Sequence, residues 1–477
     1  MNKRMMAELE NVKGFIKGFC ALMEVLALCV VYYIFWRYGY EDAEFPAYYG
    51  YGKYVLAGVY AVLSILLYKN TDCFAFGNLR KLVLCIAQWI SMLMVNFITY
   101  FQLCLIANVM VTPVPMLILS AVQAVMILVF VFIYNSLYYH IYAPHEMLMI
   151  YGNNEAVTLK FKMDDRRDKY KITKLICVDS GLERIKEEIR NFDCVLINDV
   201  PAEIRNDILK FCYENKVRTY IVPKISDILI RSAHNITVMD TPIVMVKGTG
   251  LSLVDRILKR TLDLVVCLVA MIVAAPFMLI AAIAIKLEDG GPVFFKQRRA
   301  TIDGKEFDIL KFRSMIVDAE KEGFSIPATG EDPRITKVGK IIRATRIDEL
   351  PQILNILKGD MSIVGPRPER LEHVQEYSKE IPEFAYRLKV KGGLTGYAQI
   401  YGKYNTSAYD KLRLDLMYIE NYSFLLDIKL ILLTLRIMLS KDSTEGFEKV
   451  EELEKLKQET LEQVAKEAEE AKEETLV

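Results

Sequence analysis

Charged and apolar residues are segregated along this chain rather than mixed. Residues 82–145 contain no Lys, Arg, Asp or Glu, which a water-soluble fold rarely permits over such a length. A helix needs about 20 apolar residues to cross a bilayer, and four segments meet this requirement: residues 15–36, 48–68, 82–106 and 116–139. The pattern predicts a membrane α-helical bundle of four spans within residues 1–145.

The basic residues near these segments predict their orientation. They lie before or at the start of the first segment, at Lys3, Arg4, Lys13 and Lys17, and between the second and third, at Lys69, Arg80 and Lys81. The loop after the first segment carries both signs of charge, and residues 112–115 carry none. Because cytoplasmic loops are enriched in Lys and Arg, we expect the N-terminus in the cytoplasm. An even number of spans returns the chain to that side.

Beyond residue 145 the pattern changes to short apolar runs that alternate with amphipathic stretches. We expect buried strands and intervening helices, the strands at residues 147–151, 174–178, 195–197 and 218–222 and the helices at 181–191, 202–215 and 226–233. Such alternation is typical of a parallel α/β sheet, so residues 146–250 are predicted to form a Rossmann-like α/β domain. Its first strand-to-helix turn has a single glycine, Gly152, where a pyrophosphate cradle needs two or three. We therefore expect a structural domain or one that forms a homodimer. The rival hypothesis is an oxidoreductase or epimerase that acts through this domain.

A fifth apolar stretch covers residues 264–285 and has basic residues at both ends, namely Lys259, Arg260 and Lys286. That symmetry gives no orientation preference. Ala275 and Pro276 stand near the middle, where a proline removes one backbone hydrogen bond and favours a kink. The alternatives are an ordinary kinked span and a re-entrant membrane helix that returns to the side it entered. We expect the re-entrant helix, because a fifth span would export everything after it.

Candidate chemistry is concentrated in residues 286–442, which are dense in basic residues, glycines and prolines. Five basic side chains form a cationic set: Lys311, Arg313, Arg343, Arg346 and Arg367. Such a set suits a diphosphate, because Arg offers a planar fork for phosphate oxygens and Lys a point charge.

One adjacent carboxylate pair, Asp348 and Glu349, stands among these basic residues. Neighbouring helical side chains diverge by about 100°, so both can reach one site only near a helix start. Asp348 is predicted to be a nucleophile or metal ligand, and Glu349 an acid, base or second ligand. The alternative is a solvated helix face, which such pairs commonly form.

The runs around these residues are specific in combination. They read K-F-R-S-M at 311–315, D-E-L-P-Q at 348–352, K-G-D-M-S-I-V-G-P-R-P at 358–368 and G-L-T-G-Y-A-Q at 393–399. In this order and spacing they resemble the bacterial sugar transferases, the polyprenyl-phosphate hexose-1-phosphate (monotopic phosphoglycosyl) transferases. The K-R-x-x-D run at 259–263 and the F-L-L-D run at 424–427 are further matches. With a catalytic domain at 251–444, the layout is similar to the large members that begin capsule, exopolysaccharide or O-antigen synthesis.

The resemblance implies transfer of a sugar-1-phosphate from a UDP-sugar to polyprenyl (undecaprenyl) phosphate, with release of UMP. The catalytic domain would be mainly helical, with the re-entrant membrane helix at its start. Asp348 would attack the β-phosphate, form a phosphosugar-aspartate and bind Mg²⁺. Glu349 would assist proton handling, and the phosphates would be held by Lys311, Arg343 and Arg367. The implied location is the bacterial inner (cytoplasmic) membrane, with the soluble domains on the cytoplasmic face.

Three positions depart from the usual family motifs. Ala275 stands where a serine often precedes the proline, and Thr301 replaces the first glycine of Q-x-R-x-G-x-x-G. Lys391 and Gly392 replace the Arg and Pro of R-P-G. Lysine keeps the charge but loses the guanidinium fork, which affects the detail of phosphate contact. A non-catalytic membrane scaffold is the alternative, but the carboxylate pair and its basic neighbours are all retained.

Composition narrows the classes further. Sixty basic and sixty acidic residues leave no net charge, so there is no bulk electrostatic case for nucleic acid. The nine Cys include no C-x-x-C pair, which favours buried thiols in a reducing compartment over a zinc or disulfide framework. Residues 445–477 hold twelve Glu against five Lys. This stretch is expected to be an exposed acidic C-terminal tail, with a partner-binding or regulatory role as the alternative.

Overall fold

The computed structural model describes residues 3–40, 51–77, 79–141, 144–153, 155–164, 166, 169–317, 319, 332–402 and 406–439. The chain divides into two compact units, Met1–Val222 with Leu435–Val477 and Pro223–Thr434. The expected acidic tail and the start of the second predicted span lie outside the described residues.

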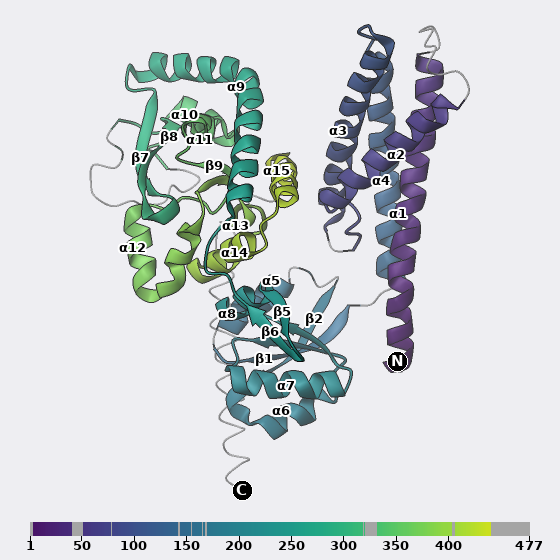
Figure 1. Ribbon diagram of the computed structural model, residues 1–477, viewed down its shortest axis with the longest axis vertical. Coiled ribbons are helices and arrows are strands. Elements are labelled where there is room, and N and C mark those ends of the chain that lie inside the picture. Colours follow the sequence, from purple (N-terminus) through teal and green to yellow (C-terminus); the bar gives the residue numbers. More distant parts are fainter. Residues whose placement is uncertain are drawn as a thin grey trace. The chain divides into compact units, whose positions relative to one another are not determined.

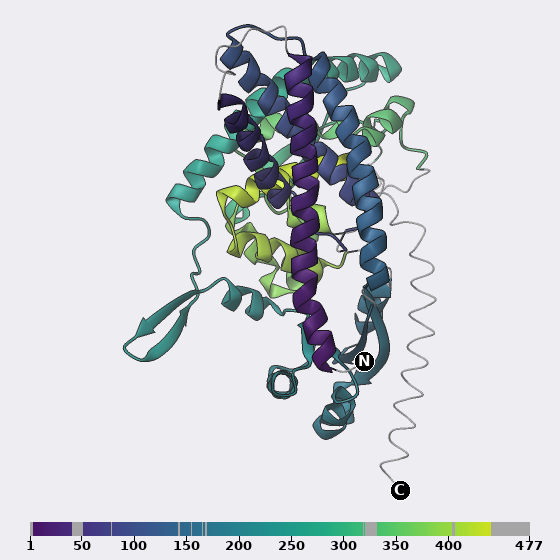
Figure 2. The same cartoon turned by 90° about the vertical axis from the view of Figure 1, so that its right-hand side faces the viewer.

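Four long apolar helices form the N-terminal bundle (Figure 1): α1 (Lys3–Gly39), α2 (Gly52–Asn70), α3 (Lys81–Ala107) and α4 (Val114–Ile141). α1 and α4 run side by side in Figure 2. Among the described residues, five helices are long and apolar enough to cross a membrane: these four and α9 (Leu253–Asp289). The prediction of four N-terminal apolar helices is confirmed.

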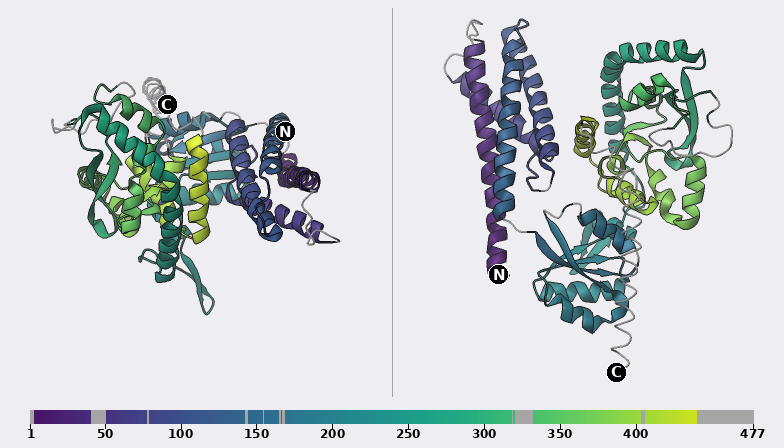
Figure 3. Two further views of the ribbon diagram at one scale, coloured as in Figure 1. Left: turned by 90° about the horizontal axis from the view of Figure 1, so that it is seen from above. Right: turned by 180° about the vertical axis from the view of Figure 1, so that it is seen from behind.

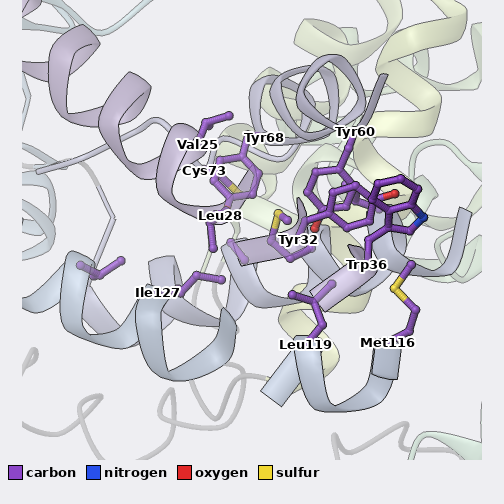
Figure 4. Packing of buried hydrophobic residues seen from close by; sticks show 14 of the residues in the cluster. Val25, Leu28, Tyr32, Trp36, Tyr60, Tyr68, Cys73, Met116, Leu119 and Ile127 are labelled. Carbon is purple, nitrogen blue, oxygen red and sulfur yellow. The ribbon is translucent and has the colours of Figure 1, made fainter. Parts of the chain in front are cut away.

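The interior of the bundle combines aromatic packing with a closed polar ring. Tyr32 on α1 stacks on Tyr60 of α2, with ring centroids 3.8 Å apart, inside the apolar cluster of Figure 4. The Tyr60 hydroxyl donates to Asn96 Oδ1 (2.7 Å), Asn96 Nδ2 donates to Gln123 Oε1 (2.8 Å), and Gln123 Nε2 donates to the Tyr60 hydroxyl (2.8 Å). In a membrane, apolar side chains contact lipid as favourably as they contact protein, so apolar burial does not hold helices together. Hydrogen bonds between helices do. The ring therefore fixes how α2, α3 and α4 meet.

The α/β region is a four-stranded sheet in the order β2-β1-β3-β4, with every neighbouring pair parallel. The strands are β1 (His145–Tyr151), β2 (Tyr170–Cys177), β3 (Cys194–Asn198) and β4 (Arg218–Ile221). The accompanying helices are α5 (Glu155–Asp164), the short turn η2 (Val178–Ser180), α6 (Leu182–Ile189) and α7 (Ala202–Glu214). Separate apolar clusters are built from alternate residues of β1, such as Leu148 and Met149. The four predicted strands and the parallel sheet are confirmed.

Gly152, which follows β1, has a packing explanation. A Cβ atom there would lie 2.2 Å from the carbonyl oxygen of Asp199, so only glycine fits. The Gly152 amide donates to the Asn198 carbonyl (3.1 Å), and Asn153 Nδ2 donates to Asp199 Oδ2 (2.6 Å). The glycine thus lets two loops of the sheet meet.

The second unit is mainly helical, with three small two-stranded sheets among its described residues. Its elements run in the order α8 (Ile225–Arg231), β5 (His234–Val238), β6 (Thr241–Met245), α9, β7 (Phe294–Ala300), η3 (Ile302–Gly304), β8 (Glu306–Phe312), α10 (Lys337–Ala344), η4 (Ile347–Glu349), α11 (Gln352–Lys358), β9 (Ser362–Val364), α12 (Leu371–Glu380), η5 (Pro382–Lys389), β10 (Gly393–Thr395), α13 (Tyr397–Tyr401), α14 (Ala408–Glu420) and α15 (Phe424–Leu439). Its largest apolar cluster joins residues of α9, α11, β9, α14 and α15. The predicted helix at 226–233 is α8, which packs on α14.

Helix α9 turns a corner between its two ends, as Figures 1 and 3 both show. Pro276 lies inside the helix, and proline is the usual cause of a sharp bend. Cys267 and Ala274 are buried in the unit, whereas Ile272, on another face, is 78% exposed and Leu279 is 63% exposed. A long apolar helix in the C-terminal region is confirmed; its path through a membrane stays a prediction.

Candidate active site

The carboxylate pair lies in a short turn between two helices. Thr336 caps α10, its hydroxyl accepting from the Gly339 amide (2.9 Å). After α10, Arg346 adopts a left-handed backbone with φ of 59°, and Asp348 and Glu349 follow in the 3-10 turn η4, just before α11. The pair therefore stands at a helix start, which is where the sequence requires it if both carboxyl groups are to serve one site.

Glu349 is held by two cations from separate elements. Lys311 Nζ on β8 and Arg367 Nη2, in the loop after β9, both donate to Glu349 Oε1 over 3.0 Å. Burial by itself would raise the pKa of Glu349, but the charges of Arg367 and Lys311 outweigh it and hold that pKa far below its usual range. Burial also lowers the pKa of Lys311, against the opposing charge of Glu349. Glu349 is therefore ionised and fixed in place.

Asp348 is in a different electrostatic state from its neighbour. No hydrogen bond or ion pair joins its carboxylate to another residue that the structure describes. Burial and the negative charge of Glu349 raise its pKa, against the opposing charges of Lys311, Arg343 and Arg346. Two adjacent carboxyl groups with pKa values pushed apart are typical of a division of roles at an active site. Asp348 is thus the member of the pair whose carboxylate is not engaged by a hydrogen bond or ion pair within the described structure.

The predicted cationic set is only partly brought together. Lys311, Arg343, Arg346 and Arg367 all act electrostatically on Asp348 or Glu349. Arg313 has other partners: its guanidinium pairs with Asp289 at the end of α9 through both nitrogens, and its Nε donates to the Pro292 carbonyl (2.8 Å). None of the contacts described for Arg313 involves the carboxylate pair. Ala275 and Pro276 lie exposed on α9.

The loop that carries Arg367 rests against the β10 turn through glycines. A Cβ atom on Gly393 would lie 2.1 Å from the Gly365 amide nitrogen, and one on Gly365 would lie 2.4 Å from the Lys391 carbonyl oxygen. The Gly365 amide donates to the Thr395 carbonyl, and the Gly393 amide to the Pro366 carbonyl, both over 2.8 Å. The G-P-R-P and G-L-T-G runs therefore form the two sides of one backbone contact, which fixes the position of the loop that carries Arg367.

The K-R-x-x-D run at the start of α9 ties three parts of the unit together. Lys259 Nζ donates to Asp427 Oδ2 on α15 (2.7 Å) and to the Tyr418 hydroxyl (2.9 Å). Arg260 donates to the Ile356 and Leu357 carbonyls at the end of α11, over 2.6 and 2.7 Å. Asp263 Oδ1 accepts from the Ser362 hydroxyl (3.0 Å) and the Ile363 amide (2.9 Å) of β9. The sequence identified both runs, and these contacts give them a structural role.

Two further buried charges went unnoticed in the sequence. Arg387 on η5 and Asp415 on α14 form an ion pair of 2.8 Å, with side chains 3% and 1% exposed. Neither residue belongs to a run singled out in the sequence; a lone arginine and a lone aspartate in amphipathic stretches give no signal of burial. Across the part of the chain that the structure describes, no group of three or more His, Cys, Asp or Glu side chains is placed to hold a metal ion.

This chain belongs to the bacterial sugar transferase family, whose model matches residues 254–441. It is similar to the UDP-N-acetylgalactosamine-undecaprenyl-phosphate N-acetylgalactosaminephosphotransferase of Aeromonas hydrophila, with 43% identity over 186 residues, which are 38% of this chain and 44% of that protein. It is similar to the UDP-glucose:undecaprenyl-phosphate glucose-1-phosphate transferase of Escherichia coli (strain K12), with 43% identity over 198 residues, 40% of this chain and 42% of that protein. The protein of the same name from Caulobacter vibrioides is 43% identical over 190 residues, 39% of this chain and 71% of that protein. The chain thus spans less than half the length of the first two relatives. The family predicted from the sequence is confirmed.

Proposed function

We propose that this protein transfers a sugar-1-phosphate from a UDP-sugar to polyprenyl phosphate and releases UMP, as the first membrane step of polysaccharide synthesis. Family membership and the names of the relatives support this class of reaction. The observation that carries it is the contrast within the carboxylate pair: Glu349 accepts hydrogen bonds from two cations, whereas Asp348 has no hydrogen bond or ion pair with another described residue. A homodimer formed through the α/β domain stays a prediction.

The chemistry we propose has two displacements at one phosphorus atom. A carboxylate oxygen of Asp348 attacks the β-phosphorus of the UDP-sugar, and the bond to the bridging oxygen breaks with departure of UMP. An oxygen of polyprenyl phosphate then attacks the same phosphorus, and the Asp348 carboxylate is regenerated. Lys311, Arg343 and Arg367 would neutralise the diphosphate, because fixed cations stabilise charge that develops during phosphoryl transfer. A covalent intermediate lets one site accept a soluble donor and a lipid acceptor in turn.

The carboxylate pair also suits Mg²⁺. This ion prefers oxygen ligands and commonly binds through one or two carboxylates together with substrate phosphates, and Asp348 has no described partner that would compete. Asp348 would hold the ion, with Glu349 as its neighbour. Mg²⁺ would supply charge neutralisation on the diphosphate.

We also propose that α9 enters and leaves the membrane on the cytoplasmic side of a bacterial inner membrane. The bend in α9 and its exposed apolar face support this path, as does the basic character of the loops near the N-terminal spans. The check is labelling with an impermeant thiol reagent in sealed cells, on a background without native cysteines. Cysteines placed just after Glu288 and just before Val254 are both expected to stay protected. Labelling of only the later site would contradict the re-entrant path.

The function is tested with purified protein, polyprenyl phosphate and a panel of UDP-sugars that includes glucose, galactose and the N-acetylhexosamines. We expect UMP release with at least one donor, which also identifies the sugar. Without polyprenyl phosphate, a labelled sugar phosphate should remain on the wild-type protein and be absent from Asp348→Asn, since an amide cannot form the acyl phosphate. Asp308→Asn, an exposed carboxylate on β8, is the matched control and should label normally. Labelling of the Asp348→Asn protein would exclude Asp348 as the nucleophile.

A further inference from the structure

A second charge cluster lies behind the loop that carries Arg367, outside the carboxylate pair. At its centre, Arg387 Nη2 lies 2.8 Å from Asp415 Oδ2. Arg387 Nη1 also lies 3.7 Å from Glu369 Oε1, and Lys411 Nζ lies 3.9 Å from the same oxygen. Arg387 is thus a buried cation between two carboxylates.

The same nitrogen of Arg387 reaches the active-site loop. Arg387 Nη2 donates to the main-chain carbonyl of Arg367 over 2.9 Å, and the Arg367 side chain donates to Glu349 over 3.0 Å. A continuous series of contacts therefore runs from Asp415 through Arg387 and the backbone of Arg367 to the carboxylate pair. Among the contacts of the described residues, Arg387 is what holds the Arg367 carbonyl.

The loop residues on either side of Arg367 have their own attachments. The Pro366 carbonyl accepts from the Gly393 amide (2.8 Å), and the Pro368 carbonyl accepts from Arg299 Nη1 (3.0 Å). Those attachments fix the ends of the turn, while the Arg387 contact acts at the residue whose side chain enters the site. A small pocket beside this contact is lined by Arg367, Glu369 and Arg387 among others.

Stability alone does not account for this cluster. Taking charges out of water costs several kcal/mol per ion, and apolar packing of similar volume is often as stable. What apolar side chains could not supply is a directed donor to one carbonyl. The guanidinium supplies it, and Asp415 holds the guanidinium in place.

We propose that Arg387, held by Asp415, is a positioning residue that fixes the main chain of Arg367. It thereby keeps the Arg367 guanidinium beside Glu349, where it would bind a substrate phosphate. The phosphate-binding consequence rests on the proposed function. The ordering of the loop does not, and the two can be tested separately.

The test uses two variants and one matched control in the purified full-length protein. Arg387→Lys keeps the charge but loses the fork, and Asp415→Asn removes the charge that holds it. Arg413→Lys is the control, because Arg413 also lies on α14 and pairs with Asp410 (3.0 Å) but has no described contact with Arg367. Hydrogen exchange of residues 362–370 reports the order of the loop, and UMP release reports activity.

Both test variants should exchange roughly tenfold faster in residues 362–370, the scale expected for loss of a hydrogen bond to a charged group. UMP release should fall by a similar factor, mainly in kcat, since Arg367 is misplaced rather than removed. Arg413→Lys should change neither. Burial raises the pKa of Asp415 to about 6, with Glu369 adding to the shift and Arg387 and Lys411 opposing it. Wild-type loop exchange, corrected for its intrinsic pH dependence, should therefore rise as the pH falls through 6, whereas that of Asp415→Asn should stay constant.

The outcomes separate the hypotheses. Normal exchange of residues 362–370 in both variants overturns the positioning role. A uniform rise across the whole unit also overturns it, because that result describes a general structural role. If Asp415→Asn does not fold, Arg387→Lys decides by the same criteria. If the variants show faster loop exchange but the wild-type protein itself releases no UMP from any UDP-sugar, the positioning role is supported and the proposed function is overturned.

Discussion

Replacing Glu349 with glutamine tests the electrostatic logic of the active site most directly. The amide keeps an oxygen that can accept one hydrogen bond but removes the charge between Lys311 and Arg367. Both cations then lose their anchor, and Asp348 loses the negative neighbour that raises its pKa. We therefore expect three separate effects: on stability, on rate and on the pH profile.

The size of the stability effect follows from exposure. Lys311 and Glu349 are 21% and 16% exposed, so losing their charged contact should cost about 1–2 kcal/mol. Arg367 is 44% exposed, so solvent screening limits its contribution to less than about 1 kcal/mol. The free energy of unfolding should therefore fall by about 2 kcal/mol. The rate of UMP release should fall about 100-fold, as is typical when a fixed electrostatic element of an active site is lost.

The pH profile gives the sharpest assay. The acid limb of kcat/KM reports ionisation of an essential group in the free enzyme, which is Asp348 in the mechanism that we propose. Because Glu349 raises the pKa of Asp348, removing its charge lowers that pKa, and the acid limb should move to lower pH. The matched control is Asp308→Asn, which also removes one carboxylate charge but at an exposed position on β8. An acid limb that stays in place or moves to higher pH in Glu349→Gln would refute the assignment of Asp348 as the titrating nucleophile.

Three other substitutions test contacts that hold the second unit, Pro223–Thr434, together. Lys259→Met leaves Asp427 buried without its cation and should lower the free energy of unfolding by about 3–5 kcal/mol, measured by denaturant unfolding. Gly393→Ala places a methyl group 2.1 Å from the Gly365 nitrogen, and should cost about 3 kcal/mol and displace the Arg367 loop, measured by hydrogen exchange. Pro276→Leu restores a backbone hydrogen bond and should straighten α9 and reduce UMP release severalfold.

Matched controls separate these effects from general damage. Lys259→Met combined with Asp427→Leu removes both charges and should recover most of the loss. Gly248→Ala meets no atom within 4 Å and should be neutral. Ala275→Leu adds a leucine beside the proline without removing it and should retain the bend. Gly393→Ala with wild-type stability, or a single and a double Lys259 variant of equal stability, would contradict the corresponding packing argument.

The sequence predicted well wherever one periodic signal dominated. The uncharged stretch at residues 82–145 predicted the apolar helices α3 and α4, and the strand β3, fully buried along its length, is a short apolar run as a parallel strand should be. The antiparallel pair β7 and β8 was not predicted. The residues of β7 alternate between exposed and half-buried. Several of them are basic on both faces, so the sequence does not show the apolar–polar alternation that would predict a strand.

The site was predictable in its residue types and only partly in its geometry. Asp348 and Glu349 are adjacent, and the motif runs that carry the pair and its cations occur in a specific order, which gave the prediction although Lys311 lies 38 positions and Arg367 18 positions from Glu349. What the sequence does not contain is which cation binds which carboxylate. Arg313 lies two residues from Lys311, a spacing that would place both side chains on one face of a strand. However, β8 ends at Phe312, so Arg313 lies outside the strand and its side chain has different partners. Arg387 and Asp415 come together from different helices, and the spacing of residues along the chain does not predict such a contact.

The buried pair of Lys259 and Asp427 sets an order of events during synthesis. The two residues are 168 positions apart, so α9 leaves the ribosome long before its partner helix exists. Until then, an ammonium at the base of an apolar helix has no internal counter-ion and must stay hydrated. The second unit can therefore complete its folding only when α15 has been made. A chain truncated before Asp427 should remain a partly folded, protease-sensitive intermediate attached to the membrane.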